Sequence, residues 1–82
     1  MSNDQALDEL VILIGKLKKA YILRKNEPTR IHYEEFKSLL KQLDELNHSR
    51  RLPFSLFSKI DKIYHKYYRF NEMKEIIDDK RK

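Results

Sequence analysis

The longest uninterrupted helical pattern lies in the C-terminal part of the chain, between Leu52 and Lys80. Pro53 starts this stretch, and no later Gly or Pro interrupts it. A helix over residues 53–79 would be about 40 Å long, so it would span a small domain. Read at alternating steps of four and three, it presents a seam in which six of seven residues are apolar or aromatic: Leu56, Ile60, Ile63, Tyr67, Phe70, Lys74 and Ile77.

Two further amphipathic helices are expected before this stretch, over residues 4–25 and 32–47. Pro28 lies in the turn between them, and the polar segment 47–52 separates the second helix from the third. We expect His32 to cap the second helix, with Glu35 at its third position as in a capping box. The first helix presents one apolar face, which Val11 widens, through Leu7, Leu10, Ile14, Leu17 and Tyr21.

The only glycine of the chain, Gly15, falls inside the first expected helix. A glycine in a helix interior costs about 1 kcal/mol relative to alanine. Close approach of a neighbouring helix would explain this choice, and a ligand-binding role for a single helical glycine has much less support.

The fold class follows from the helical periods and the scarcity of turn residues. One Gly and two Pro in 82 residues, with 38% charged residues, favour helices over a β fold or a disordered chain. Short connections favour antiparallel neighbours. We therefore expect one domain, a small all-α, antiparallel three-helix bundle with a long C-terminal helix and a frayed basic tail. Asn71 offers an alternative, since it could cap a short fourth helix.

Composition also limits the cellular setting. The chain has no cysteine, which excludes disulfides and thiolate metal sites and fits either a reducing compartment or a thermophilic source. Its first residues are acidic rather than basic, and the longest aliphatic run, Leu10 to Ile14, is too short for a membrane span or a signal core. We expect a soluble, cytoplasmic protein without a transmembrane segment. At 82 residues the core is near the lower limit of self-sufficiency, so a homodimer is an open alternative.

The excess positive charge is concentrated near the C-terminus. The formal net charge is +5, and residues 51–82 hold nine Lys and Arg against five Asp and Glu. Lys59, Lys62, Lys66 and Arg69 recur at steps of three, four and three, which places them on one side of the expected helix, next to its apolar seam. We predict a macromolecule-binding surface made of this stripe, two nearby tyrosines and two arginines of the preceding turn: Arg50, Arg51, Lys59, Lys62, Lys66, Arg69, Tyr64 and Tyr68.

Several partners fit such a surface. The first hypothesis is a protein-binding regulator or adaptor that uses this basic, Tyr-containing surface against an acidic protein or a second copy of the chain. The second is a nucleic-acid-binding accessory protein, with Lys and Arg on phosphates and Tyr available for stacking. The same residues also fit the ordinary solvated surface of a bundle, in which lysine stems cover core edges and tyrosines keep their hydroxyl groups in water.

No catalytic, metal or cofactor site is predicted. The sequence has no Gly-rich phosphate loop and no nucleophile elbow. Asp44 with His48 and Asp61 with His65 are each spaced four apart, but an antiparallel hairpin would hold the two pairs far from each other. Local charge pairing explains this spacing better than a metal site. We therefore expect a non-enzymatic protein without a small-molecule substrate.

A small, basic, cysteine-free helical bundle without a catalytic motif is similar in outline to bacteriocin immunity proteins and to small regulatory proteins of phages and plasmids. This resemblance concerns size and architecture, and it transfers no residue roles. It implies a third, weaker hypothesis, an immunity-type protein at the cytoplasmic face of a membrane, where anionic lipids would attract the same cations.

Overall fold

The computed structural model describes the backbone of residues 2–77 and the side chains of residues 5–77. Its elements are α1 (Ser2–Asn26), α2 (Arg30–Asn47), a short 3₁₀ helix η1 (Phe54–Leu56) and α3 (Phe57–Met73). Residues 2–77 contain no β-strand. The predicted all-α class with three packed helices is therefore confirmed. None of these helices is long and apolar enough to cross a lipid bilayer.

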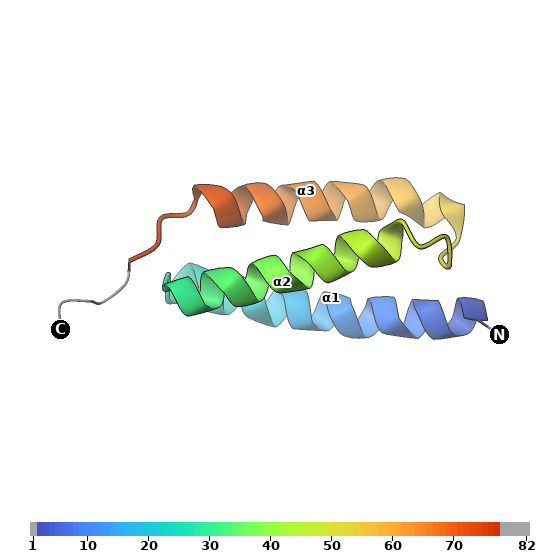
Figure 1. Ribbon diagram of the computed structural model, residues 1–82, viewed down its shortest axis with the longest axis horizontal. Coiled ribbons are helices and arrows are strands. Elements are labelled where there is room, and N and C mark those ends of the chain that lie inside the picture. The colour runs from blue at the N-terminus through green and yellow to red at the C-terminus, as the bar shows by residue number, and fades with distance from the viewer. Residues whose placement is uncertain (1, 78–82) are drawn as a thin grey trace.

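Helix α2 lies between its two neighbours. It packs along α1 and along α3, whereas α1 and α3 make few contacts with each other. In Figure 1 the N-terminus lies at the same end of the bundle as the connection between α2 and α3, and the C-terminal segment leaves from the opposite end. Consecutive helices are thus antiparallel, as their short connections predict. The described bundle is elongated, with extents of 51 × 19 × 16 Å.

The hydrophobic core runs along the inner faces of all three helices. It consists of Leu13, Leu17, Ala20, Phe36, Leu40, Leu43, Leu46 and Ile60. Tyr21, Phe36, Tyr67 and Phe70 form an aromatic cluster, in which the ring centroids of Tyr21 and Phe70 are 4.7 Å apart. Phe36 is fully buried and the other three rings are partly buried, so their packing joins α1 to α3 at the end where these helices meet. The seam expected on the C-terminal helix is confirmed at Ile60, Tyr67 and Phe70.

The buried face of α1 lies further around the helix, away from Val11, than the sequence predicts. Ala6, Leu13 and Ala20 are buried, and these were not part of the expected face. Val11 is 69% exposed, so the expectation that it widens the inner face is wrong. The reason is that α1 packs mainly against one helix, α2, which covers only one side of it.

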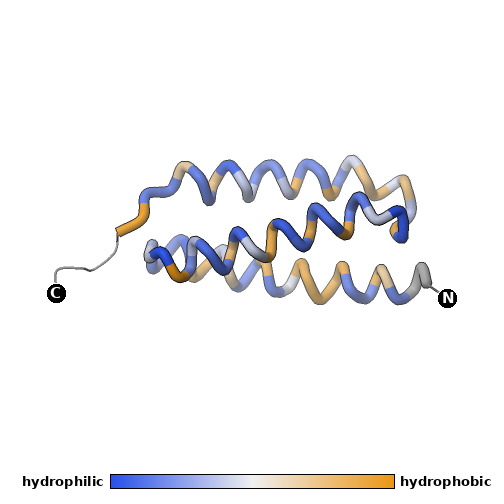
Figure 2. The backbone as a smooth tube through the Cα atoms, viewed as in Figure 1, coloured by the Kyte–Doolittle hydropathy of each residue, from blue (hydrophilic) through white to orange (hydrophobic). Residues whose placement is uncertain are grey.

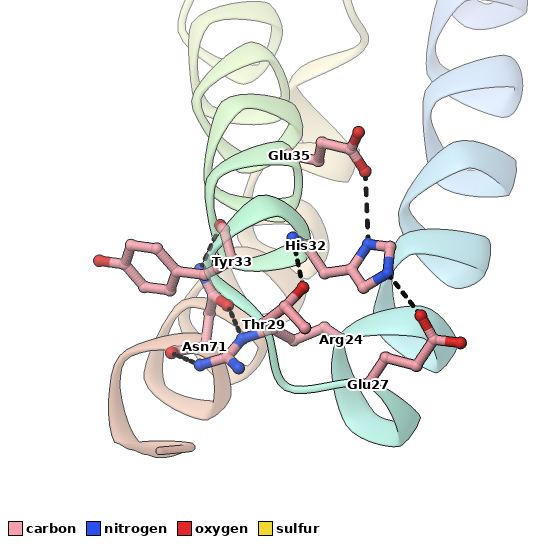
Figure 3. A network of polar contacts seen from close by, with 7 residues as sticks. All are labelled: Arg24, Glu27, Thr29, His32, Tyr33, Glu35 and Asn71. Carbon is pink, nitrogen blue, oxygen red and sulfur yellow. Dashed lines mark hydrogen bonds and ion pairs between the residues drawn. The ribbon is translucent and has the colours of Figure 1, made fainter. Parts of the chain in front are cut away.

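The N-terminus of α2 also differs from the expectation. Helix α2 begins at Arg30 with Thr29 as N-cap, and the hydroxyl of Thr29 accepts a hydrogen bond from the backbone N–H of His32 at 3.5 Å (Figure 3). His32 is therefore not the cap. Its ring lies between two carboxylates instead, with Nε2 at 3.0 Å from Glu27 and Nδ1 at 3.6 Å from Glu35.

The C-terminal helix is shorter than expected. It begins at Phe57 rather than at Pro53, which instead caps η1, and it ends at Met73 rather than near residue 79. Residues 74–77 are not helical, so a fourth helix does not start at Asn71 within the described chain. The expected helix end at residue 79 and the frayed basic tail lie outside the described residues.

A buried arginine explains why α3 ends where it does. The guanidinium of Arg24, which is 0% exposed, donates hydrogen bonds to the side chain of Asn71 at 2.6 Å and to its carbonyl oxygen at 2.8 Å (Figure 3). It also donates to the carbonyl oxygens of Lys74 and Glu75. The carbonyl of Asn71 lies in the last turn of α3, where carbonyl groups lack partners within the helix, and Arg24 supplies its donor from α1. The carbonyls of Lys74 and Glu75 follow the end of the helix. The chain then turns toward the α1–α2 connection, where the N–H of Ile77 donates to the carbonyl of Pro28 at 2.6 Å.

Candidate macromolecule-binding surface

Four basic side chains of α3 form the centre of the predicted surface. Their spacing of three, four and three residues places them along one side of the helix, and all four are exposed. We call them the basic stripe: Lys59, Lys62, Lys66 and Arg69. None of the four has an ion pair with a side chain of residues 5–77. The predicted spacing thus produces a continuous row of unpaired cations.

The basic stripe places like charges side by side. Lys62 has Lys59 three residues before it and Lys66 four residues after it, and Arg69 follows Lys66 by three residues. Each such pair on a helix costs about 0.2–0.5 kcal/mol at low salt. Lys59 also lies in the first turn of α3, where the helix dipole disfavours a cation. The stability of α3 therefore does not explain the arrangement.

The acidic residues nearest in sequence to the stripe are engaged elsewhere. Glu72, three residues after Arg69, accepts a hydrogen bond from the hydroxyl of Tyr33 on α2 at 2.9 Å. This bond is the main reason why the pKa of Tyr33 is raised above its ordinary value. Asp61 lies 3.4 Å from the ring of His65 on its own helix. Neither carboxylate forms an ion pair with a cation of the stripe, although Glu72 lines the same hollow as Lys66 and Arg69.

The two predicted tyrosines are placed differently from each other. Tyr64 packs against the core and stacks on Tyr68 with a centroid distance of 5.7 Å. Burial raises the pKa of the Tyr64 hydroxyl, and the negative charges of Asp44 and Asp61 add to this. Tyr68 is 42% exposed and borders a shallow hollow on α3 together with Lys66 and Arg69. Of the pair, Tyr68 is therefore the one that adjoins the basic stripe.

Both tyrosines also line a groove between α2 and α3. The α2 side of this groove carries charges of both signs, from Glu34, Lys37, Lys41 and Asp44. An anionic ligand that extended from the stripe across Tyr68 would therefore meet carboxylates as well as amines. The charged side chains that line the groove therefore balance, unlike those of the basic stripe.

The two arginines of the α2–α3 connection also have different surroundings. Arg50 is exposed and has a positive φ of 67°, a conformation that favours glycine, and it borders a hollow with Leu52 and Phe54. Arg51 binds Glu9 of α1 through two hydrogen bonds of 3.2 and 2.7 Å. This pairing lowers the pKa of Glu9 and raises that of Arg51. Arg51 therefore contributes to the contact between α1 and the connection, and Arg50 remains turned to solvent.

The histidine pairs form the local contacts that their spacing predicts. His48 lies 3.3 Å from Asp44, and His65 lies 3.4 Å from Asp61. Within the described residues, no three metal-ligating side chains come together in a way that could hold an ion.

Two features of the molecular surface were not found from the sequence. Phe54 of η1 is 88% exposed and stacks on Phe57. Helix α1 exposes large apolar side chains on its outer side, among them Val11 and Ile22. The signal for the second feature is that α1 carries apolar residues around most of its circumference, unlike α2 and α3.

No protein-family model matches the chain, and no match was found among curated proteins or among solved structures.

Proposed function

We propose that this protein is a non-enzymatic regulator or adaptor that binds an acidic protein surface through the basic stripe of α3. One observation carries the proposal. The stripe places four like charges next to one another, with Lys59 in the first turn of α3, and none of the four forms an ion pair with a described side chain. An acidic partner would convert this repulsion into attraction, since it would supply the missing carboxylates to all four side chains.

The surroundings of the stripe favour a protein partner over single-stranded nucleic acid. Binding of single strands relies on aromatic rings that are free to stack with successive bases. Tyr64 is packed against the core, which leaves Tyr68 as the exposed ring beside the stripe, and Glu34 and Asp44 line the groove beyond it. An acidic helix or strand that follows the outer side of α3 would avoid those carboxylates.

Binding to polyglutamate and to mixed-sequence DNA, each over a series of salt concentrations, tests this proposal. The stripe variant carries Lys62→Glu with Lys66→Glu, and the matched control carries Lys16→Glu with Lys18→Glu, two exposed residues of α1. Both variants change the net charge equally, so a difference between them reports the location of the site. We expect the stripe variant to lose polyglutamate binding by about tenfold or more and the control by no more than about threefold.

The outcomes separate the hypotheses. Equal losses in the two variants, or no binding to either ligand at low salt, would overturn a dedicated basic surface. DNA could instead bind more tightly than polyglutamate, with a steep salt dependence that the stripe variant reduces. This result would favour nucleic acid over an acidic protein as the partner.

A further inference from the structure

The outer side of α1 carries apolar side chains that nothing in the described chain covers. Val11 is 69% exposed, Ile12 59%, Ile22 55% and Leu23 42%. Eleven residues complete about three helical turns, so Val11 and Ile22 project at nearly the same angle, as do Ile12 and Leu23. Figure 2 shows that α1 has the most hydrophobic colouring of the three helices. A helix that is apolar on opposite sides is normally covered on both.

Gly15 lies between these two pairs, on the same outer side. A Cβ atom added to Gly15 would meet no other atom within 4 Å, so packing within the bundle does not require a glycine there. The glycine nevertheless costs helix stability. What it provides is a stretch of bare backbone between the exposed apolar pair Val11 and Ile12 and the exposed lysines Lys18 and Lys19, where a second helix can approach closely.

Charge determines which helix would fit this surface. Asp8 lies on the outer side before Gly15, and Lys19 lies on the outer side after it. Neither has an ion pair within the described side chains. A second α1 in parallel orientation would place Asp8 beside Asp8 and Lys19 beside Lys19. An antiparallel copy places each acidic half beside a basic half, so the surface is complementary to itself.

We propose that two copies of the chain associate through antiparallel α1 helices that cross at Gly15. In this register Val11 of one copy lies about 4.5 Å along the axis from Ile22 of the other, and Asp8 is offset from Lys19 by the same amount. Two-fold symmetry repeats both contacts, so the crossing glycines are flanked by two apolar contacts and two ion pairs. The stripe on α3 is not part of this contact, so the dimer would present it twice.

Sedimentation equilibrium of the full chain, together with three variants, tests this arrangement. Gly15→Gln adds a side chain that fits the monomer and favours a helix, so its melting temperature in dilute solution should be maintained or raised. At the crossing the same side chain separates the helices, and we expect the dimer dissociation constant to rise by about tenfold or more. Ser58→Gln, on the exposed side of α3, is the matched control and should leave the constant unchanged.

A charge exchange tests the orientation. Asp8→Lys alone should weaken the dimer by about tenfold, because both ion pairs become repulsive contacts. Adding Lys19→Asp to the same chain should restore the dimer. Within one α1 these two positions are about 16 Å apart along the axis, so restoration reports a contact between copies.

The proposal is overturned if the chain remains monomeric at millimolar concentration. It is also overturned if a dimer forms that is insensitive to Gly15→Gln, because such a dimer would use another surface. A dimer that Gly15→Gln weakens but the double charge exchange does not restore would exclude the antiparallel register.

Discussion

Arg24 and Asn71 join the end of α1 to the end of α3 through a buried hydrogen bond of 2.6 Å, across 47 positions of the sequence. The guanidinium lies 5.3 Å from the centre of the Tyr33 ring, and Asn71 in turn donates from its amide to the carbonyl of Tyr33 at 3.3 Å. Burial lowers the pKa of Arg24, but an arginine remains charged at any ordinary pH. A buried cation is thus satisfied by carbonyl and amide oxygens and by an aromatic face, and no carboxylate among the described side chains is paired with it.

Removing this guanidinium should destabilise the protein strongly. Arg24→Met keeps much of the apolar stem but leaves the Asn71 side chain and several carbonyl groups without their donor. We expect the free energy of unfolding to fall by about 2–4 kcal/mol, measured by urea denaturation. Lys18→Met on the exposed side of the same helix is the control, with an expected change within about 0.5 kcal/mol. A small effect of Arg24→Met would mean that water replaces the guanidinium.

Gly15→Ala should stabilise the isolated monomer. The added Cβ meets no atom within 4 Å, and alanine has the higher helix propensity. At a protein concentration too low for association, we expect the free energy of unfolding to rise by about 0.5–1 kcal/mol. Thermal and urea unfolding in dilute solution measure this change. A loss of stability there would reveal a close contact at Gly15 within the monomer.

The contact between Glu9 and Arg51 should make stability depend on acidic pH. Hydrogen bonds from Arg51 hold the pKa of Glu9 below its ordinary value of 4.5, so the unfolded chain binds the proton more tightly. This contribution is present above pH 4.5 and is lost as the pH falls through the lower pKa of the folded state. The difference in urea midpoint between the natural chain and Glu9→Gln should therefore shrink in acid. A constant difference would show that the pairing does not persist in solution.

Reversing one charge in the basic stripe should improve stability. In Lys62→Glu the new carboxylate lies three residues after Lys59 and four before Lys66, so two repulsive pairs become attractive. We expect a gain of about 0.3–1 kcal/mol in the free energy of unfolding at low salt, which added salt should diminish. A stability gain that accompanies weaker binding of acidic partners would show that binding was not lost through unfolding. A loss of stability would instead point to a structural role for Lys62.

Local sequence signals predicted the helices well and their ends less well. Pro28 and the polar residues 47–52 interrupt the helical periodicity, and the structure breaks the helices there. The end of α3 was missed because the apolar period continues through Ile76 and Ile77, whereas the helix stops where Arg24 reaches its carbonyl groups. Asn71, two residues before Met73, signals a possible break, but the arginine that binds it lies on another helix and has no local signal.

For the candidate surface too, the sequence predicted what depends on spacing within one helix and missed what depends on contacts between helices. Spacing along one helix placed the four cations of the stripe on one side, and their exposure follows from that position. The separate positions of Tyr64 and Tyr68 depend on where α2 packs, and the pairing of Arg51 depends on Glu9 of α1. Likewise, the N-cap Thr29 was overlooked because His32 and Glu35 mimic a capping box three residues later.

The central position of α2 has a consequence for folding kinetics. Because α2 packs against the helices that precede and follow it in the chain, most of the core forms between sequence neighbours, and little loop entropy opposes its closure. The bond between Arg24 and Asn71 joins the most distant elements, so we expect it to form after the rate-limiting step. Interactions that form late slow unfolding and leave the folding rate nearly unchanged. Arg24 would thus determine how long the native bundle persists rather than how fast it forms.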